Sequence, residues 1–171
     1  FHCYFNKNKT APQPWQAIAQ RFCSIEIYVE MKGKRMKGFD NWFVVENIFG
    51  CEFCFSNAEI MNVVANGLRG ELVLELQVND LVKTHPKKWK KWDLVYIKIC
   101  FFGVKEISMF VNHEHICIKE FLVEKLEKDF EYELKVLCNQ NYINCTYAIA
   151  RIQNIKPLVW DDNFQYYIVP E

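Results

Sequence analysis

The sequence is poor in the features that mark several large classes of protein. It has six glycines in 171 residues, and it lacks the phosphate-binding loop and the dinucleotide-binding fingerprint, which need closely spaced glycines. Its Lys+Arg and Asp+Glu totals are equal at 21 each, whereas a dedicated nucleic-acid-binding domain carries a basic excess. No apolar run approaches the length of a membrane span, and no signal peptide is visible. These absences argue against a nucleotide-dependent enzyme, a dedicated nucleic-acid-binding protein and a membrane protein.

Large apolar side chains are plentiful. Hydrophobic residues make up 51% of the chain and aromatic residues 16%, led by 14 phenylalanines. This composition supports a folded core, and aromatic side chains also dominate many protein–protein interfaces. We expect a single domain over residues 1–171, with a helix-and-strand appendage at 1–38, a core at 39–158 and a C-terminal tail at 159–171 that docks through its aromatic residues.

The eight cysteines have the surroundings of reduced core residues. Cys100, Cys117, Cys138 and Cys145 each lie in an apolar, strand-like run. Free cysteine in such a position behaves as a small hydrophobic residue. Because disulfides are rare in reducing compartments, this placement favours a cytoplasmic protein with free thiols.

The periodicity of the N-terminal third predicts two short helices. Trp15, Ile18 and Phe22 recur at helical spacing after Pro14, and the alternation in Ser24–Met31 predicts a half-buried strand after that helix. A second helix is expected from about Asn41 to Phe49, with Asp40 as its N-cap and Gly50 as its C-terminal stop.

In the rest of the chain, apolar and polar residues alternate with a period of two, which is typical of strands. The expected strands cover residues 58–65, 71–79, 94–102, 106–111, 130–138 and 145–152. The segment around Phe121–Leu126 fits either a further strand or one or two helical turns. The predicted fold class is therefore α+β, with two short N-terminal helices and a mostly antiparallel sheet of six or seven strands.

Two residue pairs raise the question of metal binding. Cys51 and Cys54 have Cys-x-x-Cys spacing, and His113 and His115 would share one face of a strand. A structural zinc site needs about four ligands, but this combination matches no zinc-finger spacing, so we expect no metal or other cofactor. Redox activity is also disfavoured, because the cysteine pair follows the end of a predicted helix instead of starting one. No nucleophile–base constellation is present, so we do not expect an enzyme.

Two charged stretches remain open to more than one interpretation. Lys83–Trp92 mixes lysines with Trp89 and Trp92, a pattern that can hold single-stranded nucleic acid. The zero net charge favours a solvated loop whose tryptophans cap the sheet. The second stretch is acidic and is either an ordinary exposed face or a docking patch for a basic protein. Its candidate contact residues are Glu120, Glu124, Glu127, Asp129 and Glu131.

Several short motifs occur in a suggestive order. Trp42 and Phe49-Gly50 start and end the second predicted helix, Phe102-Gly103-Val104 ends a middle strand, and Cys145–Ile155 forms the final strand. Between them runs the segment Phe55, Ser56, Asn57, Ala58, Glu59. Over roughly residues 41–155 the chain resembles the immunity protein 50 family of bacterial polymorphic toxin systems. That family has His and Asp where this chain has Ser56 and Asn57, which puts in doubt any role that needs an ionisable pair.

The resemblance implies a cytoplasmic bacterial protein that binds a cognate toxin and occludes it without catalysis. If the toxin is a basic nuclease, the acidic stretch is the expected docking surface. Nucleic acid and membrane are not expected partners, and the oligomeric state is open. The rival hypothesis is a metal- or nucleic-acid-binding domain that uses Cys51, Cys54, His113, His115 and the Lys83–Trp92 loop. Stoichiometric zinc, or retention on a polyanion column at physiological salt, would favour the rival.

Overall fold

A computed structural model describes residues 36–112, 116–127 and 131–170. These residues form one short helix, α3 (Phe43–Phe49), and nine strands. The strands are β1 (Glu59–Asn66), β2 (Glu71–Val78), β3 (Leu94–Phe102), β4 (Glu106–Phe110), β5 (Ile118–Lys125), β6 (Tyr132–Cys138), β7 (Tyr142–Tyr147), β8 (Ile149–Asp161) and β9 (Tyr166–Ile168). The mostly antiparallel arrangement of strands is confirmed, whereas the prediction of one sheet with six or seven strands is wrong, because the described residues form two sheets of five and four strands.

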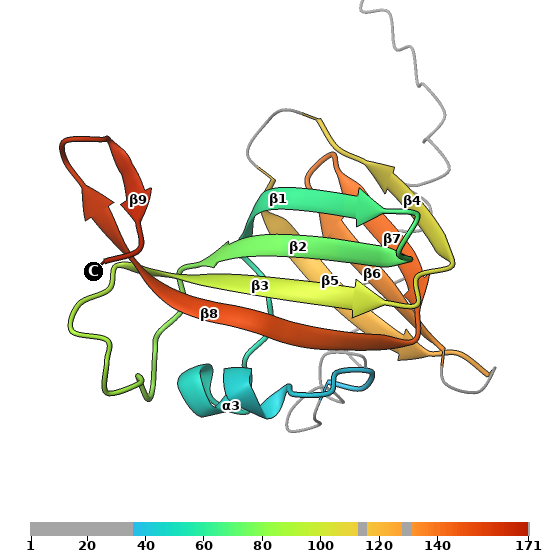
Figure 1. The fold of residues 1–171 in the computed structure, drawn as a ribbon, viewed down its shortest axis with the longest axis horizontal. Helices are drawn as coiled ribbons and strands as arrows, with labels where there is room; N and C mark the ends of the chain where they lie inside the picture. The colour runs from blue at the N-terminus through green and yellow to red at the C-terminus, as the bar shows by residue number, and fades with distance from the viewer. Residues whose placement is uncertain (1–35, 113–115, 128–130, 171) are drawn as a thin grey trace, which may run out of the picture. The chain divides into compact units, whose positions relative to one another are not determined.

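The strands form two sheets (Figure 1). One has the order β1-β2-β3-β8-β9 and the other the order β4-β7-β6-β5. The chain passes between the sheets at two corners, from β3 to β4 through Gly103 and from β7 to β8 through Ala148. Gly103 has φ 66°, and a Cβ at this position would lie 2.9 Å from the Cβ of Ala148. The two corners therefore cross so closely that only glycine fits.

The apolar faces of the two sheets enclose the core. The inward side chains of β2 are all buried, namely Leu72, Leu74, Leu76 and Val78. In the second sheet, Leu134 pairs with Cys145 and Val136 with Ile143, and these four are also buried. Because side chains alternate across a strand, the polar residues of the same strands face outward. The period-two prediction for β2 and β6 is thus confirmed.

The helix is attached to β8 by the residues that precede it. Asn41 donates from Nδ2 to the carbonyl of Ile152 (2.9 Å) and accepts from its N–H (2.8 Å). Asp40 does not cap the helix, contrary to the prediction, because its carboxylate pairs with Arg151 at 2.6 Å. Trp42 occupies the N-cap position of α3 and makes no side-chain capping bond. In Figure 1 the helix accordingly lies along β8.

The sequence-based prediction of two N-terminal helices is not supported. The described residues contain only α3, and its bounds are close to the expected Asn41–Phe49. The other expected helix and the strand Ser24–Met31 lie outside the described residues. The open segment around Phe121 is strand β5, paired with β6 from Ile118 to Lys125. Pairing with β6 decides this, since the local sequence allowed either conformation.

An aromatic cluster packs between the helix and the sheets. Phe55 is fully buried, and its ring centroid lies 5.7 Å from that of Trp42 and 4.7 Å from that of Phe121. Phe53 extends the cluster, at 5.1 Å from Phe55 and 4.4 Å from Phe49. One side chain therefore contacts the residue before α3 and a residue of β5.

We predict that Phe55→Ala lowers the free energy of unfolding by about 3–5 kcal/mol, because it opens a cavity among packed rings. Phe43→Ala is the matched control, since Phe43 belongs to α3 but is 51% exposed. The control should change stability by no more than about 0.5 kcal/mol. Urea unfolding of both variants measures the difference, and equal losses would contradict this account of the cluster.

Candidate functional site

The segment Phe55–Glu59 links the two sheets. Asn57 N–H donates to the carbonyl of Ile118 (2.7 Å), and Ile118 N–H donates to the carbonyl of Ala58 (2.8 Å). Glu59 then forms a bridge with Cys117. These bonds join the start of β1 in one sheet to the start of β5 in the other. The family-like motif therefore lies where the two sheets meet.

The polar pair within this segment shapes the turn. Asn57 has φ 68°, the left-handed region that asparagine adopts more readily than most residues. The Ser56 hydroxyl donates to the carbonyl of Lys119 at 3.2 Å. Both residues thus hold the backbone against β5, a role that needs no ionisable side chain.

A shallow pocket of about 380 Å³ lies next to this turn. It is lined by Asn57, Glu59, Gln77, Asn79, Leu94, Cys117 and Tyr167. Tyr167 comes from β9, so the pocket combines the turn with the C-terminal hairpin. Its lining is largely polar and uncharged, with Glu59 as the single carboxylate among these residues.

The cysteine and histidine pairs do not form a metal centre within the described residues. Cys51 is exposed, and the thiol of Cys54 donates to the Ser56 hydroxyl at 3.5 Å. His113 and His115 lie outside the described residues. Among those that are described, no group of three or more His, Cys, Asp or Glu side chains could hold a metal ion.

The buried cysteines of the core are unreactive thiols. Cys138 and Cys145 are buried free thiols, as the sequence predicted. Burial raises the pKa of Cys138 to about 11 and that of Cys145 to about 12. Both thiols are therefore protonated at neutral pH, whereas a nucleophilic cysteine needs its thiolate.

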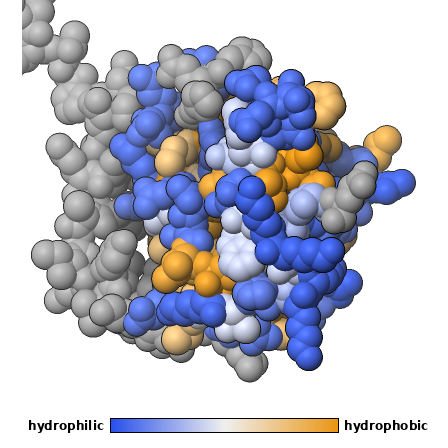
Figure 2. Space-filling model, turned by 90° about the vertical axis from the view of Figure 1, so that its left-hand side faces the viewer, coloured by the Kyte–Doolittle hydropathy of each residue, from blue (hydrophilic) through white to orange (hydrophobic). Residues whose placement is uncertain are grey.

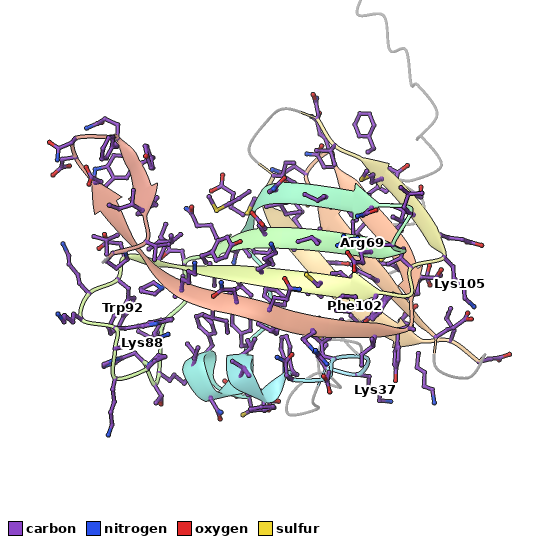
Figure 3. The ribbon with its side chains drawn as sticks, in the orientation of Figure 1. Lys37, Arg69, Lys88, Trp92, Phe102 and Lys105 are labelled. Atoms are coloured by element: carbon purple, nitrogen blue, oxygen red, sulfur yellow. The ribbon has the colours of Figure 1, made fainter. Side chains whose placement is uncertain are left out.

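The basic loop is anchored through its tryptophans. Trp89 is 3% exposed and belongs to the core, and the ring of Trp92 lies 6.1 Å from that of Trp89. The loop backbone is held at both ends, by a bond from Lys83 N–H to the carbonyl of Ile48 and another from Asp93 N–H to that of Leu158. All five lysines of the loop are exposed, namely Lys83, Lys87, Lys88, Lys90 and Lys91. Figure 3 shows Lys88 and Trp92 on this loop.

This geometry favours the simpler interpretation of the basic loop. Nucleic-acid stacking needs aromatic faces that bases can reach. Trp89 offers none because the core covers it. The loop therefore presents lysines without a stacking platform at Trp89.

The acidic stretch is partly neutralised by lysines. Lys135 on β6 forms ion pairs with Glu124 on β5 (2.8 Å) and with Glu133 on its own strand (3.0 Å). Burial lowers the pKa of Lys135, but its hydrogen bonds to these two carboxylates outweigh that effect and raise it. Glu131 pairs with Lys105. Part of the acidic surface is thus balanced within the protein itself.

The remaining members of the acidic set differ in their surroundings. Glu120 and Glu127 are exposed, and neither belongs to an ion pair within the described residues. Asp129 lies outside the described residues. The stretch therefore offers two uncompensated carboxylates on and just after β5.

The sequence-based prediction treated residues 159–171 as a tail, but residues up to Ile168 form a hairpin. Val159 pairs with Ile168, Trp160 with Tyr167 and Asp161 with Tyr166. The available signal was the turn-forming run Asp161, Asp162 and Asn163 between aromatic residues.

Together these observations define an antiparallel β protein with a short helix, a rigid core and several charged or aromatic surfaces. The described residues include no helix with the length and hydropathy of a membrane span. The sequence model of the immunity protein 50 family matches residues 41–158. The chain belongs to this family of immunity proteins, as the motifs suggested. No curated protein matches the chain.

We predict that Asn57→Ala destabilises the protein by about 1 kcal/mol, because alanine is disfavoured at positive φ. Asn57→Gly should be close to neutral, since glycine adopts this conformation without strain. Both substitutions remove the side-chain amide, so the difference in stability between the two variants measures the cost of positive φ at this position. Denaturant midpoints provide the measurement, and an alanine variant as stable as the glycine variant would refute the assigned turn role.

Proposed function

We propose that this protein binds a cognate toxin domain of a bacterial polymorphic toxin system and neutralises it in the cytoplasm. The observation that carries this proposal is the family match over residues 41–158. The matched region contains α3, β1 to β7 and β8 as far as Leu158. The whole two-sheet scaffold, and not one short motif, therefore supports the assignment.

The proposed mechanism is occlusion of the toxin without catalysis by this chain. A rigid partner can block an active site at low entropic cost, because few of its own groups must be ordered on binding. The packed core, the close crossing at Gly103 and the anchored loop after β2 all favour such rigidity. The inert core thiols are consistent with a non-catalytic role.

We further propose that the β5 side of the second sheet contacts the toxin. Glu120 and Glu127 contribute uncompensated negative charge there, while Glu124 and Glu131 are shared with lysines. A basic toxin, such as a nuclease, would be attracted to this surface over long distances. Complementary charge of this kind raises the association rate and selects among partners.

Co-expression tests the proposed function directly. The chain is expressed with the protein encoded by the adjacent upstream gene, and both growth and co-purification are scored. We expect the chain to restore growth and to co-purify with that protein. A toxin of a different system serves as the control and should not be neutralised. A toxic upstream product that is neither bound nor neutralised would reject the proposal.

Charge reversal tests the acidic surface separately. The double variant Glu120→Lys/Glu127→Lys should associate with a basic toxin on the order of tenfold more slowly and with a weaker dependence on salt. Glu52→Lys/Asp80→Lys makes the same change in net charge at exposed residues outside this stretch and is the matched control. Stopped-flow association at two ionic strengths gives the rates. If the two double variants behave alike, this surface is not the interface.

A further inference from the structure

The C-terminal hairpin, Val159–Ile168, stands apart from the scaffold in both sequence and packing. It follows the last residue of the family match, Leu158. None of its residues belongs to the buried core or packs against it. In Figure 1 it extends beyond the start of β3, at Leu94. The hairpin therefore contributes no side chain to the buried core, although Tyr167 lines the pocket beside the Asn57 turn.

The hairpin is nevertheless held in one conformation by local bonds. The Asp161 carboxylate accepts from the N–H groups of Asn163 (2.8 Å) and Phe164 (3.2 Å). Gln165 has φ 57° and donates from its backbone N–H to the carbonyl of Asp161 at 2.8 Å. At the base, Trp160 N–H donates to the Asp93 carboxylate at 2.8 Å. The turn is thus preorganised although no core covers it.

Three large aromatic side chains are exposed on this hairpin. Trp160 is 41% exposed, Phe164 62% and Tyr166 54%. The ring of Trp160 lies 5.2 Å from that of Tyr167, and the ring of Phe164 lies 5.6 Å from that of Tyr166. Figure 2 looks onto this end, where hydrophobic and intermediate residues interrupt a hydrophilic surface. Clustered exposed aromatic residues are typical of interaction sites, and a handful of such residues carries most of the binding energy in many interfaces.

The charge of this element indicates the kind of partner. Between Pro157 and Glu171 the sequence has the acidic residues Asp161, Asp162 and Glu171 and no lysine or arginine. The hairpin itself therefore supplies no positive charge for the phosphates of a nucleic acid or of an anionic lipid surface. A protein surface with an apolar hollow and a basic rim complements both the aromatic rings and the carboxylates.

We propose that the hairpin inserts its aromatic side chains into an apolar, basic-rimmed hollow of the cognate toxin. This inference rests on the proposed function, because the toxin is the partner in question. The family scaffold supplies the rigid support, and the hairpin supplies contacts specific to this chain. Its fixed turn lowers the entropy lost on binding.

The first test removes the two most exposed rings. In the full chain, Phe164→Ala/Tyr166→Ala should weaken binding to the toxin neutralised in the co-expression test at least about tenfold, as expected for aromatic anchors. Leu68→Ala/Leu81→Ala is the matched control, because these side chains are 103% and 82% exposed in other loops. The control should bind as the wild type does. Titration calorimetry gives the affinities, and thermal unfolding verifies that both variants remain folded.

The second test changes only charge at the hairpin tip. Asn163 is exposed, and only its backbone N–H is bonded to Asp161. Asn163→Lys should weaken binding to a basic hollow, whereas Asn163→Asp should preserve or strengthen it. The opposite order would overturn the charge argument.

The outcomes separate the two proposals. If the wild-type chain neutralises its toxin but the ring-deletion variant binds it with unchanged affinity, the hairpin inference fails and the proposed function stands. If the wild-type chain neutralises no toxin, both fail. If removing the rings instead changes the molar mass of the protein alone in light scattering, the hairpin is a contact between copies of this chain and the inference is overturned.

Discussion

The fold depends on the burial of Phe55 at the junction of the two sheets. Its ring contacts Trp42 before the helix and Phe121 on β5. The backbone immediately after it pairs with Ile118, which fixes the start of β5 beside the start of β1. One aromatic side chain and two backbone hydrogen bonds with Ile118 thus connect the helix and both sheets. Without this contact the apolar inner faces of the two sheets would no longer be closely packed where the sheets meet.

The same junction gives Ser56 and Asn57 a structural role, at the two positions where the sequence resemblance led us to expect His and Asp. Ser56 bonds to the backbone of Lys119, and Asn57 adopts a positive φ. Both functions are conformational, and a short polar side chain meets them without a charge. The family motif in this chain is therefore part of the scaffold. Candidate recognition groups lie elsewhere, on the β5 side and on the C-terminal hairpin.

These two candidate surfaces differ in how they use charge. On the β5 side, Lys135 and Lys105 balance much of the acidity, and exposed ion pairs of this kind contribute little stability. The hairpin instead combines exposed rings with carboxylates that accept local hydrogen bonds. The first surface suits long-range attraction and the second suits close contact. A partner that uses both would need a basic face that continues into an apolar hollow.

The strands with a regular pattern were predictable because one face of each is buried. The alternation in Leu72–Val78 and in Leu134–Cys138 identified the inward side chains. The sequence was less informative where neighbours decide the conformation. The local sequence around Phe121 is compatible with either a helix or a strand, and pairing with β6 selects the strand. Asp40 has the sequence position of a helix cap, but it forms an ion pair with Arg151, which is distant in sequence.

The candidate sites show the same division. Sequence by itself determined the antiparallel character, the family and the inert core cysteines, because burial patterns and short motifs are local properties. Only the tertiary structure decided that Trp89 is covered, that Lys135 neutralises Glu124, and that Trp160, Phe164 and Tyr166 stand exposed on a hairpin. Exposure and charge pairing depend on residues far apart in the chain, which are brought together by folding alone.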